Sequence, residues 1–265
     1  MSVDQEIVEA GYDAVYAAMP RAKTLRGTWR DHVLGPEYPA GFEHISFLSA
    51  PELERMASEV RLGAGTTLVD LGCGEGGPGL WIARGTGARL IGIDLSAVGV
   101  AHAAQRAGDL GLAEIATFTR GTFAETGLGT ACCQGVMSVD ALQYAPNKRA
   151  VFAEAARILG SGGRFVFTAF ELDPTRTKSL PVVGTDPIDD YRPLLEEAGF
   201  AVEAYEETSS WRERLVATYK AVLARREAIT EEIGEEAIGP LLMEVALTLQ
   251  HQPYRRRILA VSTRR

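Results

Sequence analysis

The stretch Asp70-Leu71-Gly72-Cys73-Gly74-Glu75-Gly76-Gly77 decides the fold of this chain. The preceding residues, 67–71, have the pattern of a short buried strand that ends in this glycine-rich turn. Pro78 suits the first turn of a helix, because the amide that proline lacks would have no partner there. Backbone amides at the start of a helix favour polar or anionic ligand groups. The stretch therefore predicts a ligand-binding turn between a strand and a helix.

Strands and helices alternate on either side of this turn. The hydrophobic pattern predicts five strands, at residues 67–71, 90–94, 115–119, 135–139 and 164–170, with helices between most of them. Such alternation is typical of an α/β fold with a doubly wound, mainly parallel sheet.

Two further segments flank this core. Residues 1–60 are rich in aromatic side chains and turn-forming residues, and we expect an N-terminal helical cap. Residues 207–253 predict a helical insertion before a final edge strand at 257–261, far longer than an ordinary connection. The core then comprises 61–206 and 254–265. The insertion is expected to be either a lid or an assembly surface, such as that of a homodimer.

Two carboxylates narrow the ligand of the glycine turn. Asp70 lies two residues before the first glycine, where a carboxylate would repel a pyrophosphate and suits a cationic ligand. Asp94 ends the second predicted strand, where an acidic residue hydrogen-bonds ribose hydroxyls. The pair predicts a ligand with a ribose but no phosphate, which disfavours an NAD(P)-dependent oxidoreductase.

With these features the sequence resembles the class I S-adenosylmethionine-dependent methyltransferases. The turn Asp70–Gly76 matches their Asp-x-Gly-x-Gly-x-Gly motif, and residues 93–96 match their second motif. Residues 136–140 and the turn 159–164 match the later motifs, and 138–144 resembles the bacterial small-molecule enzymes, including those of secondary metabolism. The resemblance covers about residues 65–170.

The resemblance implies S-adenosyl-L-methionine as cofactor and assigns residues to it. It places Asp70 and the three glycines Gly72, Gly74 and Gly76 along the methionine and ribose part. Asp94 would hold the ribose hydroxyls, Leu95 would lie beside the adenine, and Ser138 would face the methionine end. The family often has an acidic residue for the adenine amino group after the third strand. Here that segment is Gly121-Thr122-Phe123, so the contact falls to Thr122 or to backbone.

Two residues are candidates for meeting the methyl acceptor. Asp140 follows the fourth predicted strand at the edge where open α/β sheets bind ligands; a helix cap or a surface salt bridge is the alternative. His44 lies in the presumed cap, and an unperturbed imidazole titrates at ~6.5, which suits a general base. Methyl transfer is mainly a matter of holding donor and acceptor together, and a base helps where the acceptor begins protonated.

Composition excludes several other classes. The formal net charge is −8, and the basic concentration at Arg255–Arg257, Arg264 and Arg265 has the character of a solvated end rather than a nucleic-acid site. The three cysteines have neither a disulfide pattern nor zinc spacing, so we expect no metal. Without a signal peptide or an apolar run of membrane-spanning length, the sequence predicts a soluble cytoplasmic protein.

These observations leave three hypotheses for function. The first is a methyltransferase that acts on the oxygen, nitrogen or carbon of a mid-sized organic small molecule. The second keeps the fold and the cofactor but uses the pocket for a non-methylating reaction, such as a cyclisation. The third is a cofactor-binding protein without turnover, against which the intact glycine turn and Asp94 argue.

Overall fold

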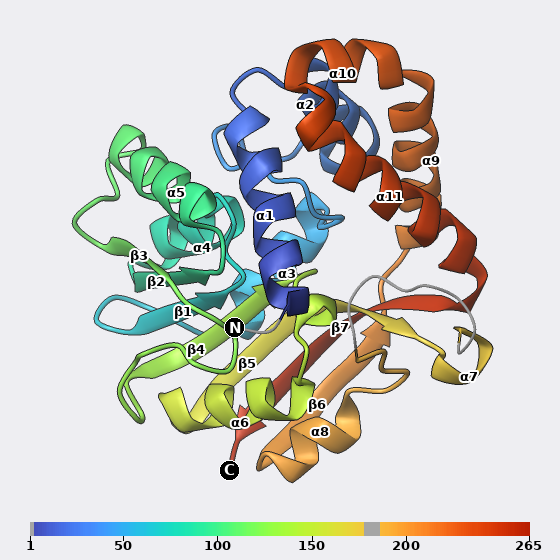
Figure 1. Ribbon diagram of the computed structural model, residues 1–265. Helices are drawn as coiled ribbons and strands as arrows, with labels where there is room; N and C mark the ends of the chain where they lie inside the picture. Colours follow the sequence, from blue (N-terminus) through green and yellow to red (C-terminus); the bar gives the residue numbers. More distant parts are fainter. Residues whose placement is uncertain (1–2, 178–185) are drawn as a thin grey trace.

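The computed structural model describes residues 3–177 and 186–265, which form a seven-stranded sheet with helices on both faces (Figure 1). The strands are β1 Thr67–Leu71, β2 Arg89–Asp94, β3 Ala116–Arg120, β4 Cys133–Val139, β5 Leu159–Leu172, β6 Phe200–Glu207 and β7 Arg255–Arg264. The α-helices are α1 Val3–Ala18, α2 Lys23–Trp29, α3 Ala50–Glu59, α4 Gly77–Thr86, α5 Ala97–Asp109, α6 Lys148–Ile158, α7 Pro174–Thr177, α8 Arg192–Glu197, α9 Trp211–Ala224, α10 Arg226–Ile233 and α11 Glu235–His251. A π-helical turn η1 spans Arg30–Leu34, and 3-10 turns η2 and η3 span Leu142–Tyr144 and Gln252–Tyr254.

The strand order is β3-β2-β1-β4-β5-β7-β6. The pairs among β1 to β5 are parallel, and β7 runs antiparallel to both of its neighbours, β5 and β6. The predicted α/β, doubly wound and mainly parallel sheet is confirmed. The prediction that the last strand lies at the edge is wrong. Strand β7 lies between β5 and β6 and pairs with both, and its run Ile258–Val261 is buried on both faces of the sheet.

Alternation along each strand builds two cores. In β1, Leu68 packs toward α3 and α4, whereas Val69 and Leu71 pack into the second core with α6 and α8. In β7, Leu259 belongs to the first core and Ile258 to the second. The parity of a strand residue therefore decides which face of the sheet its side chain reaches.

The topology determines where the insertion lies. Strand β6 ends at the same edge as the parallel strands, because both β5 and β6 run antiparallel to β7. Helices α9 to α11 connect the end of β6 to the start of β7, so they must lie at this carboxyl edge. Helix α1 joins them there, packing between α5 and α11 (Figure 1). Of the predicted segments, residues 1–2 and 178–185 lie outside the described residues.

Within residues 3–177 and 186–265, no helix has the length and hydrophobicity that crossing a bilayer requires. In the same ranges, no group of three His, Cys, Asp or Glu side chains gathers as metal ligands.

Candidate active site

A cavity of about 390 Å³ opens at the carboxyl edge of the sheet, under α1 and α11. This volume lies in the range of small-molecule sites, ~300–1,000 Å³. One end, called the glycine-turn end below, is lined by the turn Asp70–Gly77 with residues 93–95 and 121–123. The other, the aromatic end, is lined by Tyr12, Trp29, Phe47, Tyr144, Phe170, Tyr219, Glu244 and Arg255.

The glycine turn is held against the end of β2. The amides of Gly72 and Cys73 donate to the carbonyl of Ile93 at 2.8 and 3.1 Å. The glycines at 72, 74 and 76 have φ of +75°, +51° and +77°, a region that side chains with a Cβ rarely adopt. The chain can therefore turn sharply here and present its backbone to the cavity.

Tyr16 of α1 closes over this turn. A Cβ built on Gly74 would lie 2.5 Å from the Tyr16 hydroxyl, so a glycine is needed for the tyrosine to approach. Burial raises the pKa of Tyr16, which keeps the phenol protonated. Tyr16 therefore forms part of the cavity wall.

Asp94 binds the turn from the end of β2. Its Oδ2 accepts the Gly74 amide at 2.7 Å, and its Oδ1 accepts the Ser96 amide at 2.9 Å. Each carboxylate oxygen can accept a second hydrogen bond, so Asp94 retains capacity for two hydroxyl donors in the cavity. Burial raises the pKa of Asp94, and the two amides act against this rise.

Asp70 lies at the base of the glycine-turn end. Its Oδ1 is buried and has no hydrogen-bond partner among the described residues. Burial, with the nearby charge of Asp94, raises the pKa of Asp70 to about 8. A cation in the cavity would favour the ionised form. The pair Asp70 and Asp94 thus fits a ribose-bearing, cationic ligand.

Leu95, Thr122 and Phe123 line the cavity beyond Asp94, and their contact with the adenine stays a prediction. Ser138 does not reach the cavity. It is fully buried, and its hydroxyl donates to the Leu71 carbonyl at 2.7 Å. Ser138 has the parity of Val136, which packs into the second core, so its side chain points to the opposite face of the sheet. Its predicted place at the methionine end is corrected accordingly.

His44 lines the cavity, but its hydrogen bonds do not suit a general base. Its Nδ1 accepts the backbone amide of Ser46 at 3.1 Å, so in the neutral ring the proton must be on Nε2. Burial, with the nearby Arg257 and Arg106 charges, lowers the pKa of His44 to about 3. The imidazole is therefore neutral and presents an N–H donor. The expectation of an ordinary imidazole pKa fails because the ring is enclosed.

Asp140 is held in a buried ion pair. Its Oδ1 accepts from the Arg257 guanidinium at 2.9 Å, and its Oδ2 accepts the Phe47 amide at 2.8 Å. Arg257 also donates to Glu52 at 3.0 Å. Asp140 borders the cavity, yet both of its oxygens are engaged with the protein. A salt bridge describes Asp140 better than contact with the acceptor, but the salt bridge is buried and not at the surface as predicted.

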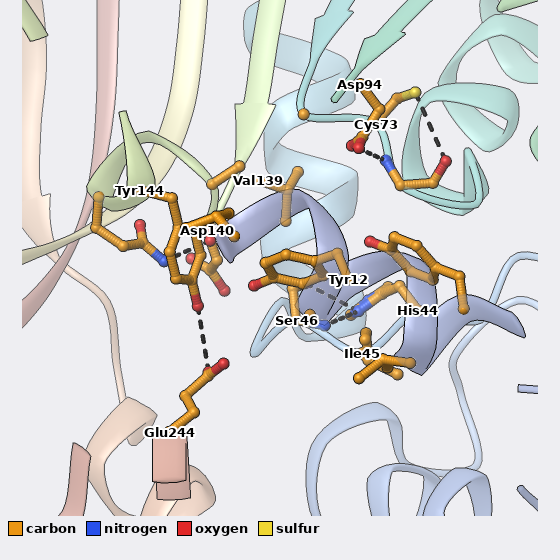
Figure 2. A pocket seen from close by; sticks show the side chains of 18 of the residues that line it. Tyr12, His44, Ile45, Ser46, Cys73, Asp94, Val139, Asp140, Tyr144 and Glu244 are labelled. Carbon is orange, nitrogen blue, oxygen red and sulfur yellow. Dashed lines mark hydrogen bonds between the residues drawn. The ribbon is translucent and has the colours of Figure 1, made fainter. Parts of the chain in front are cut away.

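Tyr12, Tyr144 and Glu244, from distant segments of the chain, meet at the aromatic end (Figure 2), and Tyr219 of α9 lines the same cavity. Oε1 of Glu244, on α11, accepts the hydroxyls of Tyr144 at 3.2 Å and Tyr219 at 2.9 Å. The ring of Tyr12 packs edge-on against Tyr144, with centroids 5.5 Å apart. Burial raises the pKa of Glu244, and the two phenols act against this rise. Sequence reasoning missed Glu244, although it is the one charged residue in the mostly apolar stretch 237–249, a pattern that indicates a buried carboxylate.

The comparisons with known proteins agree with this geometry. Residues 69–167 match the model of the methyltransferase domain, which contains the glycine turn and Asp94. The protein is a class I S-adenosylmethionine-dependent methyltransferase. S-adenosylmethionine is its cofactor.

Curated relatives extend the likeness beyond the domain. A sarcosine/dimethylglycine N-methyltransferase of Aphanothece halophytica is 29% identical over 200 residues, 71% of this chain and 70% of the relative. The 27-O-demethylrifamycin SV methyltransferase of Amycolatopsis mediterranei is 29% identical over 60% of this chain and 62% of its own length. Methyltransferase GfsG of Streptomyces halstedii is 25% identical over 80% and 77%.

Solved structures share the fold. The [4+2]-cyclase SpnF superimposes with a TM-score of 0.79 at 21% identity, covering 100% of this chain and 97% of its own. A putative sarcosine dimethylglycine methyltransferase from Galdieria sulphuraria gives 0.71 at 19% identity, covering 84% and 92%. At these identities the likeness shows the architecture alone.

Proposed function

We propose that this methyltransferase methylates a mid-sized organic small molecule enclosed in the cavity between the sheet and helices α1 and α11. The observation that carries the proposal is the continuity of one cavity from the glycine turn to the aromatic end. S-adenosylmethionine supplies an electrophilic methyl group on a sulfonium. The relatives that act on sarcosine and on a rifamycin support a small-molecule acceptor for this chain.

The glycine-turn end is proposed to hold the cofactor. Asp94 would accept the two ribose hydroxyls with its remaining acceptor capacity, and Leu95 and Phe123 would flank the adenine. Asp70 would face the cationic methionine portion, because its buried oxygen has no other partner among the described residues. The glycines at 72, 74 and 76 would allow close approach to the backbone.

The aromatic end is proposed to hold the acceptor. Tyr12, Tyr144 and Tyr219 would shape the site and exclude water. The exclusion of water protects the sulfonium of the cofactor, and the shape of the site holds the acceptor for in-line attack on the methyl group. Where the acceptor begins protonated, Glu244 would take its proton, because burial makes this carboxylate a stronger base than an exposed one. His44 would donate a hydrogen bond from its Nε2 to the acceptor molecule.

Residues 1–60 and 207–253 are proposed to act together as the cap of this cavity. Both segments supply lining residues, among them Tyr12, His44 and Glu244. An insertion that served assembly alone would not need such contacts. The small size of the cavity also favours a single organic molecule over a polymer.

The test is a methylation screen with isotope-labelled S-adenosylmethionine over phenols, carboxylic acids, amines and polyketides. Mass spectrometry should find a labelled product with one S-adenosylhomocysteine formed per product. Gly74→Val should give neither, because its Cβ would meet the Tyr16 hydroxyl. An acceptor that is converted without formation of S-adenosylhomocysteine would contradict methyl transfer and favour a non-methylating reaction such as a cyclisation.

A further inference from the structure

Three consecutive arginines at the start of β7 have three different environments. Arg256 is half-exposed and lies 3.5 and 3.6 Å from the carboxylates of Glu171 and Glu207. Arg257 is fully buried and paired with Asp140 and Glu52. Arg255 is 7% exposed. The expectation of a solvated basic end is wrong for two of the three, because β7 is an interior strand and every second side chain faces the cap.

Arg255 is a buried cation without a hydrogen bond. Across residues 3–177 and 186–265, its guanidinium donates no hydrogen bond and forms no ion pair within 4.0 Å, and its Nε is fully enclosed. The guanidinium carbon lies 5.6 Å from the ring centroid of Phe170, which restrains the plane of the fork. Burial lowers the pKa of Arg255.

Glu244 does not act as the anionic partner of Arg255. It shares the cavity wall with Arg255, yet the two form no ion pair within 4.0 Å, and its Oε1 already accepts the two phenols. An enclosed charge without a hydrogen-bonding partner is costly in a folded protein, and such groups commonly serve a function. The geometry therefore calls for an anion from the cavity.

The anion must reach Arg255 from the main cavity. Arg255 also borders a second cavity with Lys148 and Tyr191, but that space measures about 20 Å³, roughly enough for one water molecule. The main cavity reaches Arg255 from Tyr144 and Glu244, which belong to the proposed acceptor site.

We propose that Arg255 binds an anionic group of the methyl acceptor, a carboxylate or a phosphate. This inference rests on the proposed function, since it assigns the acceptor to the aromatic end. A guanidinium fork offers parallel N–H donors that match two oxygens of either group. The acceptor is then an organic acid or phosphate ester whose body lies against the aromatic side chains and whose anionic head reaches β7.

Calorimetry on the full chain saturated with S-adenosylhomocysteine tests the proposal with two matched pairs of probes. Octanoate is compared with octanamide, and phenyl phosphate with phenol. In at least one pair the anion should bind about 10- to 100-fold more tightly, as expected for a charge-assisted hydrogen-bonded pair. The pair with the larger ratio distinguishes a carboxylate head from a phosphate head.

Variants assign the preference to Arg255. Arg255→Met should abolish it and leave the melting temperature unchanged or higher, because the arginine it removes is unpaired. Arg256→Met, the adjacent control, should keep the preference. Equal binding of anion and neutral probe, no binding of either anion, or an unchanged preference in Arg255→Met would overturn the inference.

Failure of the proposed function gives a different result. If wild type does not bind S-adenosylhomocysteine, the proposed function fails, and the same titrations on the ligand-free protein still report on Arg255. If Arg255→Met weakens S-adenosylhomocysteine itself, Arg255 serves the cofactor, and the acceptor inference is overturned while the methyltransferase proposal stands.

Discussion

The two ends of the cavity are built in different ways. The glycine-turn end comes mostly from short stretches at the ends of β1 and β2, and backbone amides hold Asp94 in place. The aromatic end joins side chains from α1, η2, α9, α11 and β7, which are far apart in sequence. The difference separates the proposed cofactor site, which a local motif determines, from the proposed acceptor site, which tertiary packing determines.

The sharpest test of the aromatic end is Glu244→Gln. The amide keeps an oxygen for the phenols of Tyr144 and Tyr219 but cannot take a proton. With a hydroxyl acceptor found by the screen, turnover should fall ~10²–10⁴-fold while S-adenosylhomocysteine affinity hardly changes. In wild type the rate should fall on acidification at a pH above the ordinary glutamate range, because the base must be ionised.

Glu236→Gln, on the exposed first turn of the same helix, is the matched control and should behave as wild type. Full turnover of Glu244→Gln at saturating acceptor would make the aromatic end a positioning site without a base.

The second effect concerns stability at the same end. Arg257→Met would leave Asp140 buried without its cation and would leave Glu52 with Arg214 as its remaining partner. Urea denaturation should show a loss of about 3–5 kcal/mol in the free energy of unfolding, the usual cost of breaking a buried pair. Arg256→Met should cost less than about 1 kcal/mol, since the Arg256 side chain is half-exposed and the buried Glu171 keeps its hydrogen bond from the Tyr205 hydroxyl. Similar losses of unfolding free energy in the two variants would contradict the distinction between a buried Arg257 and a half-exposed Arg256.

At the glycine-turn end, Asp94→Ala should weaken S-adenosylhomocysteine binding by roughly 1.5–3 kcal/mol, the range for hydrogen bonds to a charged group. The same change also frees the amides of Gly74 and Ser96, so circular dichroism should accompany the calorimetry. Asp109→Ala, at the end of α5, is the control. Unchanged affinity in a folded Asp94→Ala protein would exclude Asp94 from the ribose site.

The smallest expected effect is a pH dependence that Asp70 confers. With a pKa of about 8, its carboxyl is mostly protonated at pH 7, and a bound cation favours ionisation. Affinity for S-adenosylmethionine should therefore rise toward pH 8, by about tenfold per pH unit at most, since one proton is released. Asp70→Asn should lack this contribution. If Asp70→Asn shows the same pH dependence of affinity as wild type, a group other than Asp70 causes it.

The same pKa affects folding in the opposite direction. An aspartate titrates at ~3.9 in the unfolded chain, so between about pH 4 and pH 8 the folded state binds more protons. The contribution of Asp70 to stability is therefore present at low pH and is lost as the pH rises through this window. Urea denaturation of wild type and Asp70→Asn across that window would check the sign.

The sequence predicted the sheet and the glycine-turn end because their signals are local. Asp70 and Asp94 follow hydrophobic strands whose carboxyl ends meet at one edge. Ser138 was misplaced because the register of β4, which sets the face of each side chain, depends on neighbouring strands. The base role of His44 relied on an ordinary pKa, which enclosure of the ring removes.

The aromatic end could not be predicted for a similar reason. Arg255, in a run of three arginines, has no sequence pattern that distinguishes it from a solvated charge, and the apolar stretch around Glu244 does not show which side chains it meets. Their burial follows from β7 lying between β5 and β6, which brings the insertion over the cavity. Tyr144 lay in a segment that the family resemblance already covered, yet its partner on α11 is 100 residues away.

A crystal structure of the complex with S-adenosylhomocysteine tests the central claim most directly. The account predicts ribose hydroxyls within hydrogen-bond distance of Asp94, the adenine between Leu95 and Phe123, and the sulfur directed toward Tyr144 and Glu244. A nucleoside bound at the aromatic end, or a sulfur directed away from it, would contradict the division of the cavity into a cofactor end and an acceptor end.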